Sequence, residues 1–277
     1  MNLDYFYVPP LPETLVSCIS YMYADSFDYD ILVKKITSDV GLTEKLFTVA
    51  NSQYYSQGAV ATSNLKQALT RIGVTSLLKI LTSEYYNTVF KNTETDFFTL
   101  RDFNRHASYV SHLAVTLGEH LQVEDTNDLM IAGLFHDIGL LARSHCQNSL
   151  MQKIVHKCKE NKIDFYSAEM LETLPTHDAL GKQVANKWNL SDRVTFLIEH
   201  HHTPENQRPT TPDYGLHKEL DILTFADTLA HRMKFGYNDY IRDTKVNQSF
   251  LDRLGLSLDI IAKKTQDTFK AVTALSF

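Results

Sequence analysis

The spacing of apolar residues in this chain is helical almost throughout, and this feature limits the possible folds more than any other. Apolar side chains recur every three or four positions, and long alternations of apolar and polar residues are missing. The predicted helices cover 12–25, 30–39, 41–52 and 64–90 in the first half, and 100–122, 125–143, 148–162, 175–189, 191–202, 216–234 and 248–275 in the second. The pattern predicts an all-α protein.

Length and breaks in the pattern set the expected domain organisation. A chain of 277 residues can bury a large core, either in one big helical domain or in two smaller ones. The stretch KNTETD interrupts the helical pattern near residue 95. We expect an N-terminal helical half over 1–95, a second helical half over 96–236, and a C-terminal helical tail over 237–277 that packs on the rest.

Composition excludes several classes of protein. Hydrophobic residues make up 43% and charged residues 22% of the chain, which is ordinary for a globular protein. The net charge of −6, without a long basic block, argues against a dedicated nucleic-acid surface. No apolar stretch is long enough to span a membrane, and no signal-peptide pattern opens the chain, so we expect a cytoplasmic protein. Its 3 cysteines lack metal-type spacing and are expected to be reduced and buried.

The segment LFHDIGLLARSHC, residues 134–146, carries a His-Asp pair, His136-Asp137, within an apolar run. The dipeptide is weak evidence by itself, because a chain with 12 histidines contains such pairs by chance, and a second pair occurs at His177-Asp178. The pair can bind a metal ion or form a polar contact inside a helical core. The residues that the fold brings beside it must decide between the two.

Helix lengths predict which residues those are. His106 shares a helix face with the apolar residues Phe103 and Val110, so it points into the core. From His106 to the helix end is about 22 Å, and from the next helix start back to His136 is about 17 Å. An antiparallel hairpin therefore returns His136 and Asp137 to the side of His106.

The same arithmetic applies to the next hairpin. His177 lies about 17 Å before the end of its helix, and the following helix returns about 15 Å to the histidine triplet 200–202. Asp227 lies in an apolar helical stripe, where a buried carboxylate needs a cation or several hydrogen bonds. Imidazoles with carboxylates suit Zn, Fe, Mn, Co or Ni rather than Ca, and two ions close together would suit phosphate-ester hydrolysis.

Each of these residues also has an interpretation without a metal. Singly, His106, His136, Asp137 and Asp227 are more often structural polar residues of a core, and only their joint spacing favours a metal site. The triplet 200–202 can simply interact with the negative end of a helix. The remaining histidines considered are expected at the surface or in packing: His112, His145, His156, His217 and His231.

The spacing of His106, His136-Asp137 and Asp227 resembles the H…HD…D signature of the HD-domain phosphohydrolase superfamily. HDALGKQVANKWNL followed by IEHHHTPE is similar to a stretch of the HDOD subfamily, the HD-related output domains of bacterial signalling proteins. VPPLPETLVSCISYM and ITSDVGLTEKLFTVANSQYYSQGAVATSNLKQALTRIGVTSLLKIL resemble that subfamily's N-terminal half. The resemblance covers about residues 8–235 and implies an HD-like helical fold with an N-terminal helical subdomain.

The resemblance also implies site residues, by comparison with the HD-GYP cyclic-dinucleotide phosphodiesterases. HH-x-P favours His201 and His202 over His200, and Asp102 lies where those enzymes can place a further carboxylate. They have a phosphate-binding lysine where this chain has Leu140, and their GYP block is absent here. The positions that match their metal ligands are His106, His136, Asp137, His177, His201, His202 and Asp227, which would bind one or two divalent transition-metal ions.

Two functions remain open from the sequence. One is a signalling module that binds a partner protein or a small phosphorylated ligand, with the His/Asp site structural or ligand-sensing. The other is an active metal-dependent phosphohydrolase in which Asp137 bridges two ions or acts as a base. Tyr54 and Tyr55 can mark a partner surface, although packing between helices explains them more simply.

Overall fold

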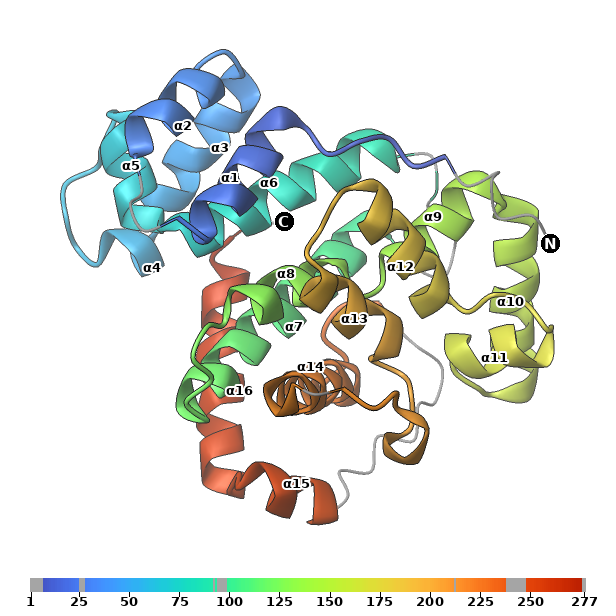
Figure 1. Cartoon of the computed structure of the whole chain (residues 1–277). Coiled ribbons are helices and arrows are strands. Elements are labelled where there is room, and N and C mark those ends of the chain that lie inside the picture. The colour runs from blue at the N-terminus through green and yellow to red at the C-terminus, as the bar shows by residue number, and fades with distance from the viewer. Residues whose placement is uncertain are drawn as a thin grey trace. The chain divides into compact units, whose positions relative to one another are not determined.

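The structure is a computed structural model that describes residues 7–24, 28–91, 93, 99–211, 213–237 and 248–275 (Figure 1). Every regular element of these residues is a helix, as the sequence predicts. The chain divides into two compact units. The N-terminal unit contains 11–89 and the chain from 266 onward; the site unit contains the remaining described residues, in 7–10 and 90–265. The predicted boundaries at 95 and 236 stay predictions.

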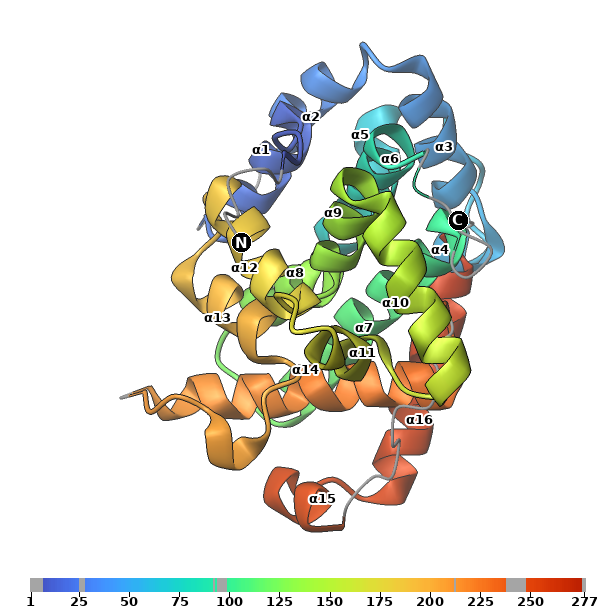
Figure 2. The ribbon, with the colours of Figure 1, turned by 90° about the vertical axis from the view of Figure 1, so that its right-hand side faces the viewer.

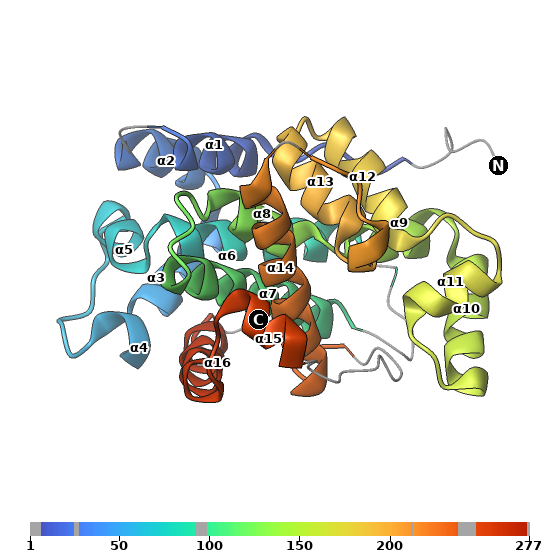
Figure 3. The ribbon, with the colours of Figure 1, turned by 60° about the horizontal axis from the view of Figure 1, so that its bottom comes forward.

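The N-terminal unit is built from short amphipathic helices whose buried leucines and isoleucines form its core. Helix α1 packs on α2 and α6, while α5 packs on α2, α3, α4 and α6 (Figure 3). Polar side chains mark several helix starts: Asp28, Asp39 and Asn64 accept hydrogen bonds from first-turn amides. Its helices are α1 (Glu13–Met22), α2 (Tyr29–Ile36), α3 (Val40–Ala50), α4 (Gln53–Ser56), α5 (Leu65–Ile72) and α6 (Val74–Val89).

The site unit is organised around two antiparallel helix pairs, α7 with α8 and α12 with α13. Helix α9 packs on α12, and α14 packs on α7, α8 and α13 (Figure 2). The bounds are α7 (Leu100–His120), α8 (Asn127–Phe135), α9 (Ile138–Cys146), α10 (Asn148–Asn161), α11 (Phe165–Leu171), α12 (His177–Lys187), α13 (Asp192–His200), the 3-10 helix η2 (Glu205–Gln207), α14 (Tyr214–Arg232) and α15 (Gln248–Leu254). Helix α16 (Leu258–Thr273) has residues in both units.

Three of the predicted helices are wrong in extent. The stretches 64–90 and 248–275 each form two helices, divided at Gly73 and at 255–257. More important for the site, 125–143 is divided at His136-Asp137, so the pair connects α8 to α9 instead of lying inside one helix. Two short α-helices, α4 and α11, and the 3-10 helix η2 were not predicted. Within the described residues, no helix is long and apolar enough to cross a membrane.

Candidate metal centre

The candidate site forms where two helices meet end to end. His136 follows the last residue of α8, and Asp137 precedes the first residue of α9. The backbone of Asp137 (φ −98°, ψ 11°) departs from helical geometry, and the two helices are separated at this point. Gly139 allows α12 to approach this junction, because a Cβ at this position would lie 1.9 Å from the carbonyl oxygen of His177. The glycine of the HDIG sequence therefore brings the two His-Asp pairs of the chain together.

An inner cluster surrounds one oxygen of Asp137. It consists of His106 from α7, His136 and Asp137 from the junction, and Asp227 from α14, and all four side chains are buried. Oδ2 of Asp137 lies 2.9 Å from Nε2 of His136 and 3.5 Å from Nε2 of His106. Oδ1 of Asp227 lies 3.1 Å from Nε2 of His106, and the two Nε2 atoms are 3.3 Å apart.

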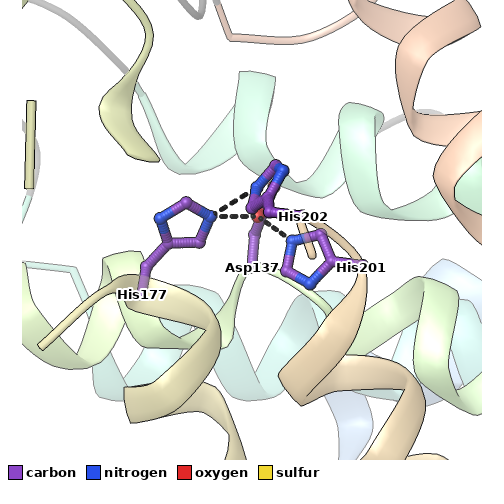
Figure 4. Close-up of side chains that lie close together, drawn as sticks. All are labelled: Asp137, His177, His201 and His202. Carbon is purple, nitrogen blue, oxygen red and sulfur yellow. Dashed lines mark hydrogen bonds and ion pairs between the residues drawn. The ribbon is translucent and has the colours of Figure 1, made fainter. Parts of the chain in front are cut away.

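An outer cluster surrounds the second oxygen of Asp137 (Figure 4). It consists of Asp137, His177 at the start of α12, and His201 and His202 at the end of α13. Oδ1 of Asp137 lies 3.4 Å from Nε2 of His177 and 3.5 Å from Nε2 of His201. Nε2 of His202 lies 2.8 Å from Nε2 of His177. Asp137 thus belongs to both clusters.

Three of the imidazoles are oriented by hydrogen bonds on the far side of the ring. Nδ1 of His136 donates to the carbonyl of Gly133 at 3.0 Å, and Nδ1 of His201 donates to the carbonyl of Ile198 at 2.7 Å. Nδ1 of His177 donates to Glu169 at 2.8 Å. When Nδ1 carries the proton in a neutral imidazole, Nε2 presents a lone pair, and here each Nε2 faces a cluster.

The donor set fits transition-metal ions. Two ligands that lie about 2.1 Å from one ion are about 3.0–3.4 Å apart at ordinary coordination angles. The close contacts in the two clusters, at 2.8–3.7 Å, bracket this range, and all candidate ligand atoms of each cluster lie within 4.8 Å of one another. Nε2 of His201 is completely buried yet has no hydrogen-bond partner among the described residues. An ion between these atoms would satisfy it.

The charges of the buried carboxylates also favour a bound cation. Burial opposes charge on His136, but the carboxylates of Asp137 and Asp227 outweigh it and raise the pKa of His136 to about 10. Burial likewise opposes charge on His177, whose pKa Glu169 and Asp137 raise to about 9. Against burial, His136 holds the pKa of Asp137 well below its usual range. The acidic groups therefore require positive charge, which protons on His136 and His177 or metal ions can supply.

A buried ion pair supports the outer cluster. Oε2 of Glu169, on α11, accepts from both the backbone amide and Nδ1 of His177, at 2.7 and 2.8 Å. Its other oxygen lies 3.2 Å from Nε of Arg143, and Arg143 also donates to the carbonyl of Pro175. Glu169 and Arg143 are buried. This arrangement fixes His177 from behind, as carboxylates do for metal-bound histidines.

The structure brings together all seven residues that the sequence proposes as metal ligands, and their role as ligands stays a prediction. It also separates two neighbours from the clusters. Nδ1 of His200 lies 3.2 Å from the hydroxyl of Thr203, and the Asp102 carboxylate accepts from the hydroxyl of Thr99.

Three residues beside the clusters were missed. His231, expected in packing or at the surface, has Nε2 3.1 Å from Oδ1 of Asp227; its position one turn after Asp227 was an available signal. Glu169 belongs to a helix that the sequence pattern did not predict. Tyr237 donates to Asp137 from beyond the end of α14, where no helical pattern could place it.

A scan against family models matches the HDOD domain to residues 8–204. Among curated proteins, an uncharacterized protein of Treponema pallidum is 23% identical over 207 residues, which cover 73% of this chain and 40% of that protein. The chain thus spans about two fifths of the length of this relative.

Solved structures with the same fold include two bacterial proteins. An HDOD domain protein of unknown function from Geobacter sulfurreducens has a TM-score of 0.77 at 19% identity, covering 97% of this chain and 92% of that one. A proposed phosphohydrolase from Shewanella amazonensis has a TM-score of 0.69 at 17% identity, covering 97% and 93%. At these identities the likeness shows the fold alone.

Proposed function

This chain belongs to the HDOD domain family, and we propose that it is a signalling module of that family whose two buried His/Asp clusters bind one or two divalent transition-metal ions. In this proposal the metal-loaded site unit recognises a partner protein or a small phosphorylated ligand. The ions in question are Fe, Mn, Zn, Co or Ni, because the donors are imidazoles and carboxylates.

One observation carries the proposal: Asp137 directs one oxygen to each cluster. A carboxylate between two sets of histidines is the arrangement in which two neighbouring ions share a ligand. Nε2 of His177 and Nε2 of His202 lie 2.8 Å apart, a distance at which they can share one proton in a hydrogen bond or coordinate the same ion.

In this proposal, different residues of the site retain the ion, orient a ligand and admit small molecules. His106, His136 and Asp227 form a cluster without solvent access, so they favour retention of what they bind. Glu169 orients His177 from behind. His202 is partly exposed, so the outer cluster is the side from which a ligand can approach.

Metal content tests this function. The protein, stripped with a chelator and reloaded separately with Mn(II), Fe(II), Co(II), Ni(II) and Zn(II), is expected to retain up to two ions per chain by elemental analysis. His136→Ala should lose most of this metal, whereas His156→Ala, which changes an exposed histidine on α10, should retain it. A wild-type protein that takes up no stoichiometric metal would contradict the proposal.

The same shared carboxylate supports a second candidate function, metal-dependent phosphate-ester hydrolysis. Divalent ions in such a centre polarise phosphoryl oxygens and lower the pKa of water. The chain supplies Asp137 for either bridging or accepting a proton, and a partly exposed outer cluster for substrate entry. Leu140, where HD-GYP enzymes have a lysine, is buried in α9 and offers no charge to a phosphate. This difference ranks hydrolysis second.

Hydrolysis of bis(p-nitrophenyl) phosphate by the metal-loaded protein separates the two candidates. A signalling module should bind metal and release no p-nitrophenol above the rate of the stripped protein. Turnover that requires metal and disappears in Asp137→Ala would replace the signalling proposal with the enzymatic one.

A further inference from the structure

We propose that Tyr237 is a positioning residue of the metal centre, which orients the shared carboxylate of Asp137 and closes the inner cluster. This inference rests on the proposed metal site. Tyr237 follows α14 in the sequence FGY, outside the helical pattern and outside the set of residues expected at the site.

The contact is specific to one oxygen of the shared carboxylate. The phenol hydroxyl of Tyr237 donates a hydrogen bond to Oδ2 of Asp137 at 2.5 Å. Oδ2 is the oxygen that faces His106 and His136, while Oδ1 faces the outer cluster. A donor held on Oδ2 fixes the rotation of the carboxylate and therefore the direction of both oxygens.

The backbone before Tyr237 can take this path only with glycine. Gly236 has φ +111°, and a Cβ there would lie 2.5 Å from Cβ of His106 and 2.8 Å from the carbonyl oxygen of Asp102. The chain therefore runs directly against α7 at the position of His106. This close approach delivers the next side chain, Tyr237, to the inner cluster.

Aromatic packing holds the ring in place. Tyr237 is stacked on Phe103, with ring centroids 5.9 Å apart, and lies beside Phe165 at 6.1 Å. It meets the rings of His106 and His231 edge-on at 4.8 and 5.3 Å. With Tyr237 only 5% exposed, its ring covers this side of the inner cluster.

The consequence is that the two clusters differ in access. The inner residues His106, His136 and Asp227 are at most 1% exposed, and Tyr237 lies over them, whereas His202 of the outer cluster is partly exposed. Small ligands should therefore exchange at the outer cluster and be excluded from the inner one.

Cobalt spectroscopy of Tyr237→Phe tests the hydrogen bond. Tyr109→Phe is the matched control, because Tyr109 is another buried tyrosine of the site unit, and its hydroxyl reaches Sδ of Met233 instead of a cluster. The Co(II)-loaded proteins are compared by their visible absorption bands and by Co(II) affinity, after circular dichroism shows that each is folded. We expect altered bands and about tenfold weaker Co(II) binding in Tyr237→Phe, with neither change in Tyr109→Phe.

The outcomes separate this inference from the proposed function. If wild type binds Co(II) but Tyr237→Phe matches it in bands and affinity, Tyr237 serves packing only and the positioning role is wrong. If wild type binds no Co(II), the proposed metal function fails, and the Tyr237 inference fails with it.

The covering of the inner cluster by Tyr237 is tested with azide, a small anion that can bind to cobalt. In wild type we expect azide to perturb the bands of one cobalt ion, and in Tyr237→Ala the bands of both. An equal azide response of the two proteins would overturn the closure.

Discussion

The two clusters share Asp137 but differ in how the fold holds their other members. The inner cluster takes His106 and Asp227 from the interiors of the long helices α7 and α14, and both side chains are buried. The outer cluster takes His177 from the start of α12, and His201 and His202 from the end of α13. A helix interior fixes its side chains more firmly than a helix end does, because helix ends fray.

The outer cluster compensates with hydrogen bonds to its imidazoles. Glu169 accepts one hydrogen bond from the imidazole of His177 and one from its backbone amide, and the carbonyl of Ile198 accepts from the imidazole of His201. His202 remains partly exposed, beside the ring of Tyr166 at a centroid distance of 5.1 Å. Under the proposed metal binding, the buried inner cluster would retain its ion and the partly exposed outer cluster would exchange ligands, and four predictions test this difference.

The largest effect is expected at the shared carboxylate. Asp137→Asn removes the negative charge that the two clusters share and leaves Asp227 as the one carboxylate among them, so the affinity for both ions should fall by at least about 100-fold. Asp128→Asn is the matched control, because Asp128 is a buried carboxylate of the site unit that contacts Arg193 and Ser191 and belongs to neither cluster. Elemental analysis and calorimetric titration measure both variants. Retention of one full ion in Asp137→Asn would show that one cluster does not depend on Asp137.

The stability of the metal-free protein should distinguish the clusters next. His136→Ala leaves the carboxylate of Asp137 buried without its main cation, which costs about 3–5 kcal/mol. His202→Ala removes a partly exposed imidazole and should lower the free energy of unfolding by less than about 1 kcal/mol. Urea unfolding in the presence of a chelator measures both. Equal losses would contradict the division into a buried and an accessible cluster.

Most of the fold was predictable because helical periodicity records which face of each helix is buried. The errors lie where local backbone geometry overrides that pattern. The apolar run around His136 continues through the junction of α8 and α9, so periodicity does not reveal the break. Gly139 was visible in the sequence, but its role depends on the carbonyl of His177, which lies far along the chain.

The candidate site was predictable to the extent that its residues lie on helix pairs of similar length. The hairpin arithmetic places His136 beside His106, and the structure has their Nε2 atoms 3.3 Å apart. It says nothing of Glu169 or Tyr237, because neither lies on a predicted helix. Their positions depend on loop paths, and loop paths carry no periodic signal.

A smaller effect is expected where the outer cluster is supported from behind. Glu169→Gln keeps an oxygen that can accept from His177 but removes the charge that attracts it and that pairs with Arg143. Metal affinity should fall about 10-fold, mainly from the outer ion. Glu172→Gln, on the partly exposed carboxylate that pairs with Lys157, is the control. A fall in affinity for the inner ion alone would contradict the proposed role of Glu169 in supporting the outer cluster.

The most gradual effect is the pH dependence of the metal-free protein. The pKa values of His136 and His177, about 10 and about 9, exceed the value of about 6.5 expected in the unfolded chain. The folded state therefore binds more protons than the unfolded state over this range, so raising the pH from about 7 should destabilise the fold. Each histidine contributes a slope of up to about 1.4 kcal/mol per pH unit, which ends near pH 9 for His177 and near pH 10 for His136.

A lysine of the N-terminal unit opposes this trend and must be removed first. Burial lowers the pKa of Lys79 to about 7, so the unfolded state binds its proton more strongly, and stability rises with pH over the same range. The measurement is therefore urea unfolding of Lys79→Met protein in chelator, from pH 7 to pH 10, compared with the same protein carrying His136→Ala. Burial raises the pKa of Cys18 to about 12, which adds the same decline above about pH 9 to both proteins. Between about pH 9 and pH 10 the decline should therefore be steeper when His136 is present. Equal slopes in the two proteins over this range would show that His136 does not hold a proton there.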